Sequence, residues 1–454
     1  MRRQGFDGRK LLATAGFGLL LIATAATHLN AAAPGEREKK VRADKANLEN
    51  DENWIYDDWN KAVAEAKATN KPLLVVLRCI PCEACSKFDD EVVRRNEAVR
   101  ALMDQFVCVR IVKANGLDLN LFQYDYDQSF HAFLTNADGT IYGRFGTRSE
   151  SKDETQDMTM QGFARALELA LAWHGEYPRN KDRFAGKHGP QPLVERPEQY
   201  PLLSGKYDSK LDYEGNKLVQ SCIHCHQVRE AERHYYREAG KPMPENVLYP
   251  FPLPKVVGLT MNSLEAGEVK AVEEGTPAAR AGFRSGDRIQ AFNGSPVLSI
   301  ADMQWVLHRF DSSGSLPVQV RRGDEAVNLV LDLPEGWRTK SDLSWRPTSW
   351  DLRRMAFGGM KMKSLTAEER TPYKLAGDRL ALLIEHVGQY GDHAKAKQAG
   401  FVKGDVLVKY AGSTEPATET ELMARSMQKH KPGDQIPVTV LRGGKEIDLK
   451  IPVQ

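Results

Sequence analysis

Helical and extended periods of apolar residues alternate along the first third of the chain. Residues 59–70 predict a helix, because apolar residues recur at helical spacing, and Lys71-Pro72 ends it. Residues 73–77 are all apolar and predict a buried strand that leads directly into a group of cysteines. A second helix is expected next, with these apolar positions on one side: Phe88, Val92, Val93 and Val99.

More strands and a last helix complete this part of the pattern. Residues 106–112 predict a strand that contains Cys108, and two further strands flank the turn Ala137-Asp138-Gly139. Residues 163–173 have the period of a closing helix. The order strand, cysteines, helix, strand, hairpin and helix predicts an α/β domain over residues 50–176.

The C-terminal half contains an internal repeat. Residues 277–289 include Ala-Gly-Phe-Arg-Ser-Gly-Asp, and residues 394–407 include Ala-Gly-Phe-Val-Lys-Gly-Asp. Each copy continues into a strand, a turn, an amphipathic helix and another strand. A period well above 50 residues indicates tandem domains rather than a solenoid. We therefore expect two mainly β domains with helices, at 255–335 and 357–454, joined by a linker at 336–356.

The segments outside these domains differ in character. Residues 177–215 are polar and rich in proline and glycine, which predicts a linker, and residues 216–254 form a short α/loop segment. Residues 1–33 have a basic start, about 16 apolar residues and small residues at the end, which is typical of a signal peptide. Because about 20 apolar residues are needed to span a membrane, both cleavage and a retained anchor stay open. Either outcome places the mature chain in the periplasm or elsewhere outside the cytoplasm.

Composition narrows the function classes. A chain of 454 residues is expected to form about three domains. A net charge of +2, with 27% charged residues of both signs interspersed, argues against a nucleic-acid-binding protein. Five of the six cysteines lie in two tight groups, 79–85 and 222–225, and this grouping indicates chemistry rather than structural disulfides.

The second cysteine group has the spacing of a covalent haem site. In Cys222-Ile223-His224-Cys225-His226, the two thiols can add to the vinyl groups of one c-type haem while His226 binds the iron. The prolines beside Met243 are typical of a loop that presents a sixth ligand, and His234 and Met261 are alternatives. A zinc site, a plain disulfide and an accidental match are the other interpretations of the cysteine pair. Met243 as an ordinary loop residue also stays open.

The first cysteine group resembles the thioredoxin-like family, in which a Lys-Pro pair precedes the strand and Cys-x-x-Cys follows it. This resemblance aligns the redox pair with Cys82 and Cys85 and leaves Cys79 as an extra thiol. A thiol at a helix N-terminus has a lowered pKa, so Cys82 is expected to attack and Cys85 to resolve. The family's cis-proline has no counterpart in residues 127–131, and a metal role or a redox-silent domain are the alternatives.

Both repeat copies resemble bacterial, protease-associated PDZ domains. Such domains add a peptide as an extra strand and bind its terminal carboxylate with the N–H groups of a glycine loop. The resemblance places the first loop at Val257-Gly258-Leu259-Thr260 and the second at Phe357-Gly358-Gly359-Met360. The second loop is less regular, so the second copy is the expected spacer. The sequence contains no recognisable serine protease elbow.

The whole arrangement resembles the thioredoxin-like/PDZ (seleno)protein family of planctomycete-type bacteria, some members of which are thought to carry selenocysteine in the redox motif. The sequence thus predicts an extracytoplasmic redox protein that combines a thiol domain, one covalent haem c and PDZ domains that bind exported proteins or C-terminal peptides. Thiol-disulfide exchange and electron transfer both stay open as its activity. A PDZ scaffold with a redox-silent thioredoxin-like domain and a haem-based sensor are the rival hypotheses.

Overall fold

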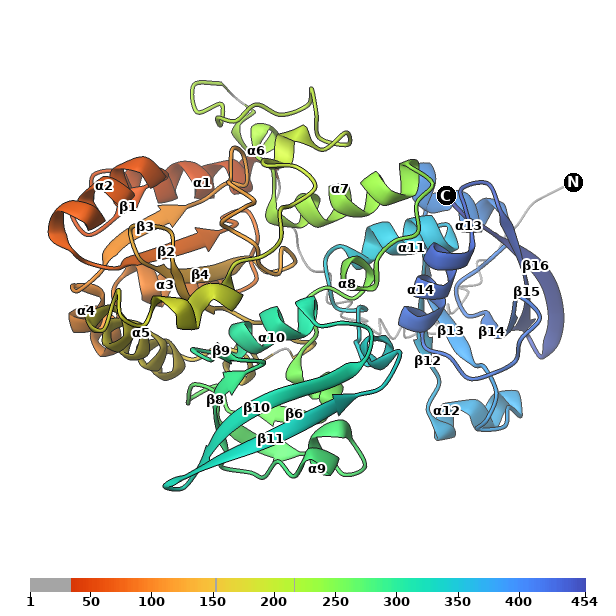
Figure 1. Ribbon diagram of the computed structural model, residues 1–454. Coiled ribbons are helices and arrows are strands. Elements are labelled where there is room, and N and C mark those ends of the chain that lie inside the picture. The colour runs from red at the N-terminus through yellow and green to blue at the C-terminus, as the bar shows by residue number, and fades with distance from the viewer. Residues whose placement is uncertain (1–33, 152, 216) are drawn as a thin grey trace, which may run out of the picture.

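The N-terminal domain is built on a five-stranded sheet in the order β1-β3-β2-β4-β5 (Figure 1). The computed structural model describes residues 34–151, 153–215 and 217–454, so the predicted signal peptide at 1–33 lies outside the described residues. Strands β1, β2 and β3 are parallel, and β4 and β5 are antiparallel to their neighbours. The strands are β1 (Ile55–Tyr56), β2 (Leu73–Arg78), β3 (Val107–Ile111), β4 (Phe130–Thr135) and β5 (Ile141–Phe145).

Strand β2 is central, and all six of its residues are buried. Its side chains alternate between two apolar clusters, with Leu73 and Val75 on one face of the sheet and Leu74 and Val76 on the other. Burial on both faces explains why the strand is a continuous apolar run rather than an alternating one.

Helices cover both faces of this sheet. One face packs against α2 (Trp59–Thr69) and α7 (Cys225–Glu238), and the other packs against α3 (Ser86–Val93), α4 (Glu97–Met103) and α5 (Met160–Gly175). The helix at 59–69 begins after the cap Asp58, whose side chain accepts from the Lys61 N–H. The strand and helix order agrees with the sequence prediction. The one long helix expected around residues 88–99 is instead two helices, because Asn96 caps a new start.

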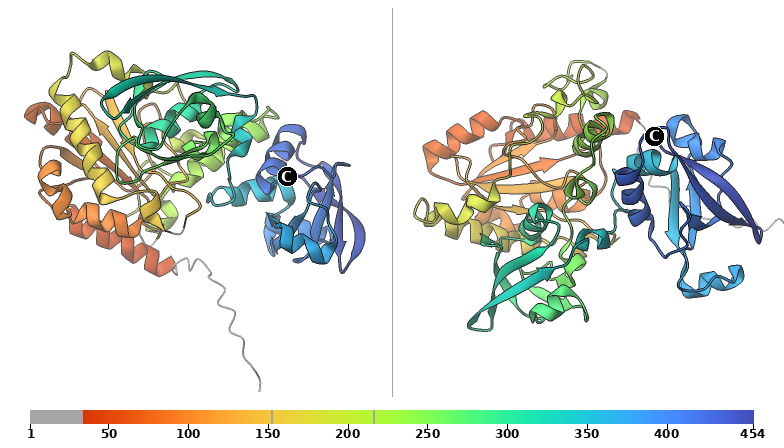
Figure 2. Two further views of the ribbon diagram at one scale, coloured as in Figure 1. Left: turned by 90° about the horizontal axis from the view of Figure 1, so that it is seen from below. Right: turned by 45° about the vertical axis from the view of Figure 1, so that its right-hand side comes forward.

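The position of helix α7 differs most from the sequence prediction. Residues 216–254 were expected to form a segment of their own, but Val228 and Ala231 of α7 pack in the same cluster as Leu73 and Val75 of the sheet. The far end of α7 reaches the second repeat domain, where the Arg237 guanidinium donates to the Gln454 carbonyl. This helix therefore runs from the N-terminal domain to the second repeat domain (Figure 1), and Figure 2 shows the same domains from two further sides.

The first repeat domain contains a sheet in the order β11-β10-β8-β9 and a separate β6-β7 pair. Its strands are β6 (Leu259–Met261), β7 (Val269–Val272), β8 (Arg288–Phe292), β9 (Ser295–Pro296), β10 (Gly314–Arg322) and β11 (Glu325–Leu333). Its helices are η4 (Pro254–Val257), α9 (Pro277–Ala281) and α10 (Ile300–Arg309).

The second repeat domain contains one sheet in the order β12-β13-β14-β15-β16. The strands are β12 (Met360–Ser364), β13 (Leu382–Val387), β14 (Val406–Tyr410), β15 (Gln435–Arg442) and β16 (Lys445–Pro452). The helices are α11 (Ser349–Phe357), α12 (Ala367–Arg370), η6 (Thr371–Tyr373), η7 (Gly391–Ala394), α13 (Lys395–Gln398) and α14 (Glu419–Lys429). Helix α11 lies in the predicted linker, but Leu352 and Met355 pack in this domain's core.

The remaining connections are also packed rather than free. Phe184 from the predicted linker 177–215 is buried in the core of the N-terminal domain, and Tyr200 and Leu203 pack on its other face. The elements not yet named are α1 (Pro34–Leu48), η1 (Glu154–Gln156), η2 (Lys181–Lys187), η3 (Pro197–Gln199), α6 (Leu218–Ser221), α8 (Glu245–Leu248) and η5 (Trp337–Lys340). Across residues 34–454, apart from 152 and 216, no helix has both the length and the apolar character to span a membrane.

Buried polar contacts fix the domains against one another. Asp302 of α10 accepts from the Arg144 N–H of β5 and pairs with the fully buried Lys187 at 2.7 Å. Between the repeats, the Arg346 guanidinium is 2.7 Å from Asp125 and 3.0 Å from Asp127, and all three side chains are buried. The Asp302 contacts hold the first repeat domain against the N-terminal domain. The Arg346 contacts hold the connecting segment 336–348 against the N-terminal domain.

Candidate functional site

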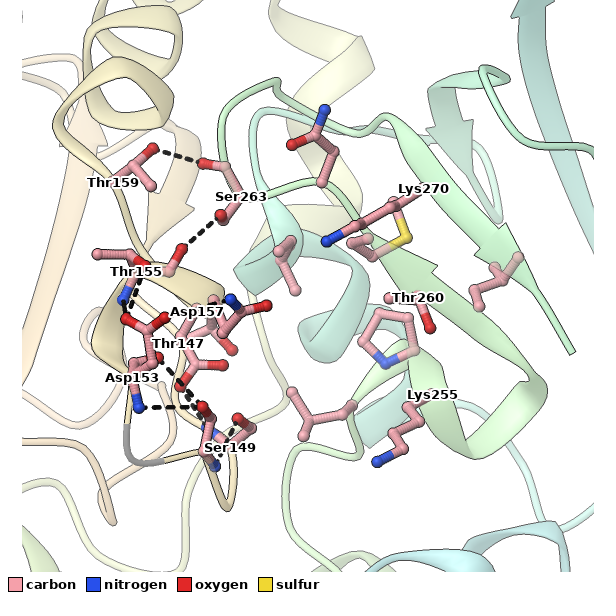
Figure 3. A pocket seen from close by; sticks show the side chains of 18 of the residues that line it. Thr147, Ser149, Asp153, Thr155, Asp157, Thr159, Lys255, Thr260, Ser263 and Lys270 are labelled. Atoms are coloured by element: carbon pink, nitrogen blue, oxygen red, sulfur yellow. Dashed lines mark hydrogen bonds between the residues drawn. The ribbon is translucent and has the colours of Figure 1, made fainter.

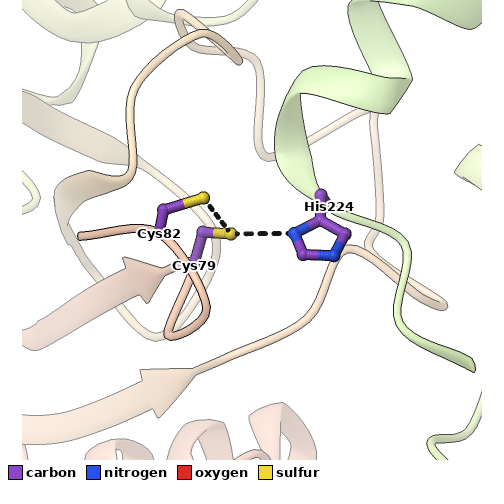
Figure 4. Close-up of side chains that lie close together, drawn as sticks. All are labelled: Cys79, Cys82 and His224. Atoms are coloured by element: carbon purple, nitrogen blue, oxygen red, sulfur yellow. Dashed lines mark hydrogen bonds between the residues drawn. The ribbon is translucent and has the colours of Figure 1, made fainter. Parts of the chain in front are cut away.

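Two cysteines and one histidine meet at the edge of the N-terminal domain (Figure 4). The Sγ atoms of Cys79 and Cys82 are 2.9 Å apart, and Cys79 Sγ is 3.2 Å from Nδ1 of His224. Cys79 and Cys82 follow strand β2, whereas His224 immediately precedes α7, 145 residues later. Cys79 is buried, while Cys82 and His224 are partly exposed, so the group is reachable from solvent.

The loop that carries the two cysteines is held by its own backbone and by one buried arginine. The Cys79 N–H donates to the Ser129 carbonyl at 2.9 Å, and the Cys82 N–H donates to the Cys79 carbonyl at 3.0 Å. The Arg78 guanidinium donates to the Cys82 carbonyl and is itself fixed by Asp89 at 3.0 Å. The two sulfurs are therefore positioned before any ligand binds.

The structure does not bring Cys82 and Cys85 together as the alignment predicted. Cys85 is the cap residue of α3 and has a left-handed backbone with φ of 60°. Its side chain packs in the cluster on the α5 face of the sheet, whereas Cys79 and Cys82 lie against the α7 face. The Cys85 N–H donates to Glu154 at 3.2 Å. The close pair is Cys79 and Cys82.

Electrostatics distinguish the two thiols. The hydrogen bond from Cys79, together with His224 and the charge of His226, lowers the pKa of Cys82 to about 4 despite its burial. The hydrogen bond to Cys82 and burial raise the pKa of Cys79. The sequence had attributed a lowered Cys82 pKa to a helix N-terminus, but α3 begins only at Ser86. Burial raises the pKa of Cys85, and it raises that of Cys108 to about 12.

Sequence reasoning missed His224. It lies inside the Cys-x-x-Cys-His motif at a position that carries no role in haem attachment. The local signal was a histidine between two cysteines, but nothing in the sequence places it beside a loop 145 residues earlier. Packing of α7 on the sheet makes this contact, since Ile223 and Val228, on either side of His224, are buried in the domain core.

The two thiols of the predicted haem motif are packed in different surroundings. Cys222 is buried with Val41, Leu211 and Leu218. Cys225 is buried on the sheet face, and its Sγ accepts a hydrogen bond of 3.0 Å from the Tyr124 hydroxyl. Covalent haem requires both thiols to face one edge of the macrocycle. Both thiols are buried, so a haem could reach them only if the start of α7 opened, and covalent haem stays a prediction.

His226 and Met243 lie in different surroundings. The Nδ1 atom of His226 lies 3.1 Å from Glu230, and a third of its side chain is exposed. Burial lowers the pKa of His226, but the hydrogen bond and charge of Glu230 raise it more. Met243 follows α7 and is buried in the core of the second repeat domain. The pairing of His226 and Met243 on one iron stays a prediction.

The glycine loop of the first repeat domain opens onto a hollow of about 710 Å³ (Figure 3). Leu259, Thr260 and Met261 of β6 and Ile300 of α10 line one side. Gly258 has φ of 95°, and a Cβ there would lie 2.0 Å from the Thr276 hydroxyl oxygen, so only glycine fits this turn. Val257 is fully buried beneath the loop.

The opposite wall of this hollow belongs to the N-terminal domain. It is formed by the loop between β5 and α5, which includes Thr147, Ser149, Asp153 and Asp157. Two hydrogen bonds join the walls at one end, from the Thr159 hydroxyl to the Ser263 carbonyl at 2.8 Å and from the Ser263 hydroxyl to the Thr155 carbonyl at 2.6 Å.

The corresponding groove of the second repeat domain is closed from within. The backbone N–H of Met362 in β12 donates to Glu419 of α14 at 2.6 Å, and Glu419 also pairs with the buried Arg353 of α11. The N–H groups of Gly358 and Gly359 donate to the Arg354 and Arg353 carbonyls at the end of α11, and Phe357 and Met360 are fully buried. These donors are thus engaged within the domain.

Comparison with known proteins identifies the domains. The family model for thioredoxin-like domains matches residues 54–137, and the model for the PDZ domain matches residues 256–333 and 392–453. The chain therefore contains a thioredoxin-like domain followed by PDZ domains, and this part of the sequence prediction is confirmed.

The curated relatives are proteases, and the similarity is partial. A probable periplasmic serine endoprotease DegP-like of Pseudomonas fluorescens is 24% identical over 178 residues, which is 39% of this chain and 35% of that protein. The putative serine protease HhoA of Synechocystis sp. is 34% identical over 82 residues, which is 18% of this chain and 19% of that protein. The chain thus spans about a third or less of the length of these relatives.

Two solved structures share a low overall similarity with the chain. The serine endoprotease from Yersinia pestis is 20% identical, with 25% of this chain and 37% of that chain covered and a TM-score of 0.19. The HtrA-type protease AlgW with tripeptide is 16% identical, with 36% and 51% covered and a TM-score of 0.22. Similarity at this level carries no conclusion about the function of this chain.

Proposed function

We propose that this chain is an extracytoplasmic thiol-disulfide redox protein that recruits exported polypeptides through its first repeat domain. The observation that carries the proposal is the 2.9 Å separation between the sulfurs of Cys79 and Cys82. A disulfide bond is about 2.05 Å long, so a small movement of one side chain closes the pair. The location is supported by the Pseudomonas relative, which is a probable periplasmic protease.

The proposed reaction uses the two thiols in different roles. Cys82 is the partly exposed thiol with the lowered pKa, so its thiolate attacks one sulfur of a substrate disulfide and releases the other as a thiolate. Cys79 then attacks Cys82 in the mixed disulfide, with its proton passing to Nδ1 of His224 at 3.2 Å. The substrate gains two electrons and leaves as a dithiol, and the chain keeps a Cys79–Cys82 disulfide. A dithiol partner is required to reduce it again.

The first repeat domain is the proposed docking site. Its groove combines an apolar floor of Leu259, Met261 and Ile300 with the lysine Lys270, while Lys255 pairs with Glu150 at 2.8 Å. This lining suits a peptide with an apolar C-terminal residue and a free carboxylate. The loop that forms the opposite wall also supplies Glu154, which accepts from the Cys85 N–H, so a docked peptide lies one loop away from the thiol-bearing segment. The closed groove supports a spacer role for the second domain.

The test is reduction of insulin disulfides by the full chain, with dithiothreitol supplied as the reductant. We expect activity in the parent, and only the background rate in Cys82→Ser and Cys79→Ser. Cys85→Ser is the matched control and should retain most of the activity, because Cys85 faces the other side of the sheet. Activity that is lost in Cys85→Ser but kept in Cys79→Ser would show that the redox pair is Cys82 and Cys85, as the family resemblance predicted. An inactive parent would favour the rival function, a PDZ scaffold.

A further inference from the structure

Cys79, Cys82 and His224 have the composition and spacing of a metal site. One donor atom from each residue lies within 4.8 Å of both others (Figure 4). Two thiolates and one imidazole form a soft ligand set, which prefers thiophilic cations such as Zn²⁺ and disfavours Mg²⁺ and Ca²⁺. We infer that the reduced chain binds one Zn²⁺ ion between the loop that follows β2 and the start of α7.

The geometry requires only a small rearrangement. Zinc bonds sulfur at about 2.3 Å in tetrahedral sites, which places two bound sulfurs about 3.8 Å apart. The sulfurs of Cys79 and Cys82 are 2.9 Å apart, so one of them must move by about 1 Å. Cys82 is partly exposed and lies in a loop rather than in a helix, which allows this movement.

The surroundings of the three ligands support the assignment. The Arg78 guanidinium donates to the Cys82 carbonyl and the Cys79 N–H donates to the Ser129 carbonyl, so the cysteine loop is fixed. On the other side, the His224 N–H donates to the Gln227 side chain at 2.8 Å, which holds the residue at the start of α7. Supporting contacts of this kind orient metal ligands. Three protein ligands leave a fourth position, and the partial exposure of Cys82 and His224 directs it toward solvent.

Metal binding and disulfide formation at this pair exclude one another. Oxidation of the two thiolates to a disulfide transfers two electrons to the oxidant, breaks both sulfur–zinc bonds and releases Zn²⁺. The inference uses the thiol pair of the proposed function but does not need insulin reduction. If the chain binds zinc but does not reduce insulin, the zinc site stands and the proposed function is wrong. If the chain reduces insulin but does not bind zinc, the proposed function stands and the zinc site is wrong.

The experiment is a Zn²⁺ titration of the full, reduced, chelator-treated chain, with a chromogenic chelator as competitor and Mg²⁺ as the negative control. We expect one Zn²⁺ per chain and no competition from Mg²⁺. His224→Gln, Cys79→Ser and Cys82→Ser should each weaken binding by at least about tenfold. Cys85→Ser is the matched control and should bind as the parent does, because Cys85 packs on the other face of the sheet. Binding that survives His224→Gln but is lost in His226→Gln or Cys225→Ser would overturn the assignment.

Two readouts on the parent chain make the test independent of how the variants fold. Co²⁺ bound at this site should give sulfur-to-cobalt charge-transfer absorption, which reports thiolate ligation. Diamide, the oxidant, should then release one equivalent of Zn²⁺ as it forms the Cys79–Cys82 disulfide. A cobalt spectrum without thiolate absorption, or zinc that remains bound after the disulfide has formed, would contradict the inference.

Discussion

The backbone N–H of Met362 donates a 2.6 Å hydrogen bond to the carboxylate of Glu419. Glu419 is the first residue of α14, and the residue at the same position of the first repeat domain is Ile300, which lines the open groove. A peptide that adds to a PDZ domain as a strand needs free backbone donors on the receiving strand. The first residue of this helix therefore differs between the two repeats: it is the apolar Ile300 in the repeat with the open groove and the hydrogen-bonded Glu419 in the repeat with the closed groove.

This relationship predicts that Ile300→Glu weakens peptide binding by about tenfold or more, or about 1.4 kcal/mol, because it adds a carboxylate to the apolar groove. The measurement is fluorescence polarisation with labelled peptides that have an apolar C-terminal residue and a free carboxylate. Glu419→Gln serves as the matched change in the second repeat and should leave the affinity unchanged. An affinity that depends on Glu419 instead would place the docking site in the second domain.

The lowered pKa of Cys82 predicts an unusual pH profile for alkylation by iodoacetamide. A thiol is deprotonated above its pKa, so with a pKa of about 4 the thiolate persists throughout the neutral range. The Cys82 rate should stay flat between about pH 8 and pH 5 and fall near pH 4, whereas an ordinary thiol slows below about pH 8.5. Mass spectrometry of metal-free chain identifies the modified residue. A rate that rises with an ordinary midpoint would show that Cys79 and His224 do not stabilise this thiolate.

Covalent haem can be tested directly. Because Cys222 and Cys225 are buried and Cys225 accepts a hydrogen bond from Tyr124, we expect no c-type band in a pyridine haemochrome spectrum of chain produced with a c-type cytochrome maturation system. The comparison is a variant in which both cysteines are alanine. A c-type band that is present in the parent and absent from this variant would establish haem attachment and would mean that the start of α7 opens during maturation.

The buried ion pairs of Arg346 predict a large effect on stability. In Arg346→Ala, Asp125 and Asp127 lose their partner while remaining buried, which typically costs about 3–5 kcal/mol. Urea unfolding followed by tryptophan fluorescence measures the change. Arg321→Ala removes an exposed pair with Asp324 at the hairpin of β10 and β11 and should have no measurable effect. Equal midpoints for the two variants would show that the buried pairs contribute little.

The domain types and the chemistry available to them were predicted from the sequence alone. Residues 73–77 of the central strand are all apolar because both faces of the strand are buried, and this local property can be recognised without knowing what the strand packs against. The repeated Ala-Gly-Phe-x-x-Gly-Asp turn is also a local pattern, and it was enough to predict two similar domains. The six cysteines likewise limited the chemistry to thiol, haem or metal sites.

Which of these residues meet depends on packing between distant parts of the chain. Cys79 pairs with Cys82 rather than leaving Cys82 to Cys85, because the left-handed backbone at Cys85 turns its side chain to the other face of the sheet. His224 joins the pair because α7 packs on a sheet formed by a distant part of the chain. Such contacts depend on the packing of elements that are far apart in the sequence. The spacing of residues within one motif does not predict that packing.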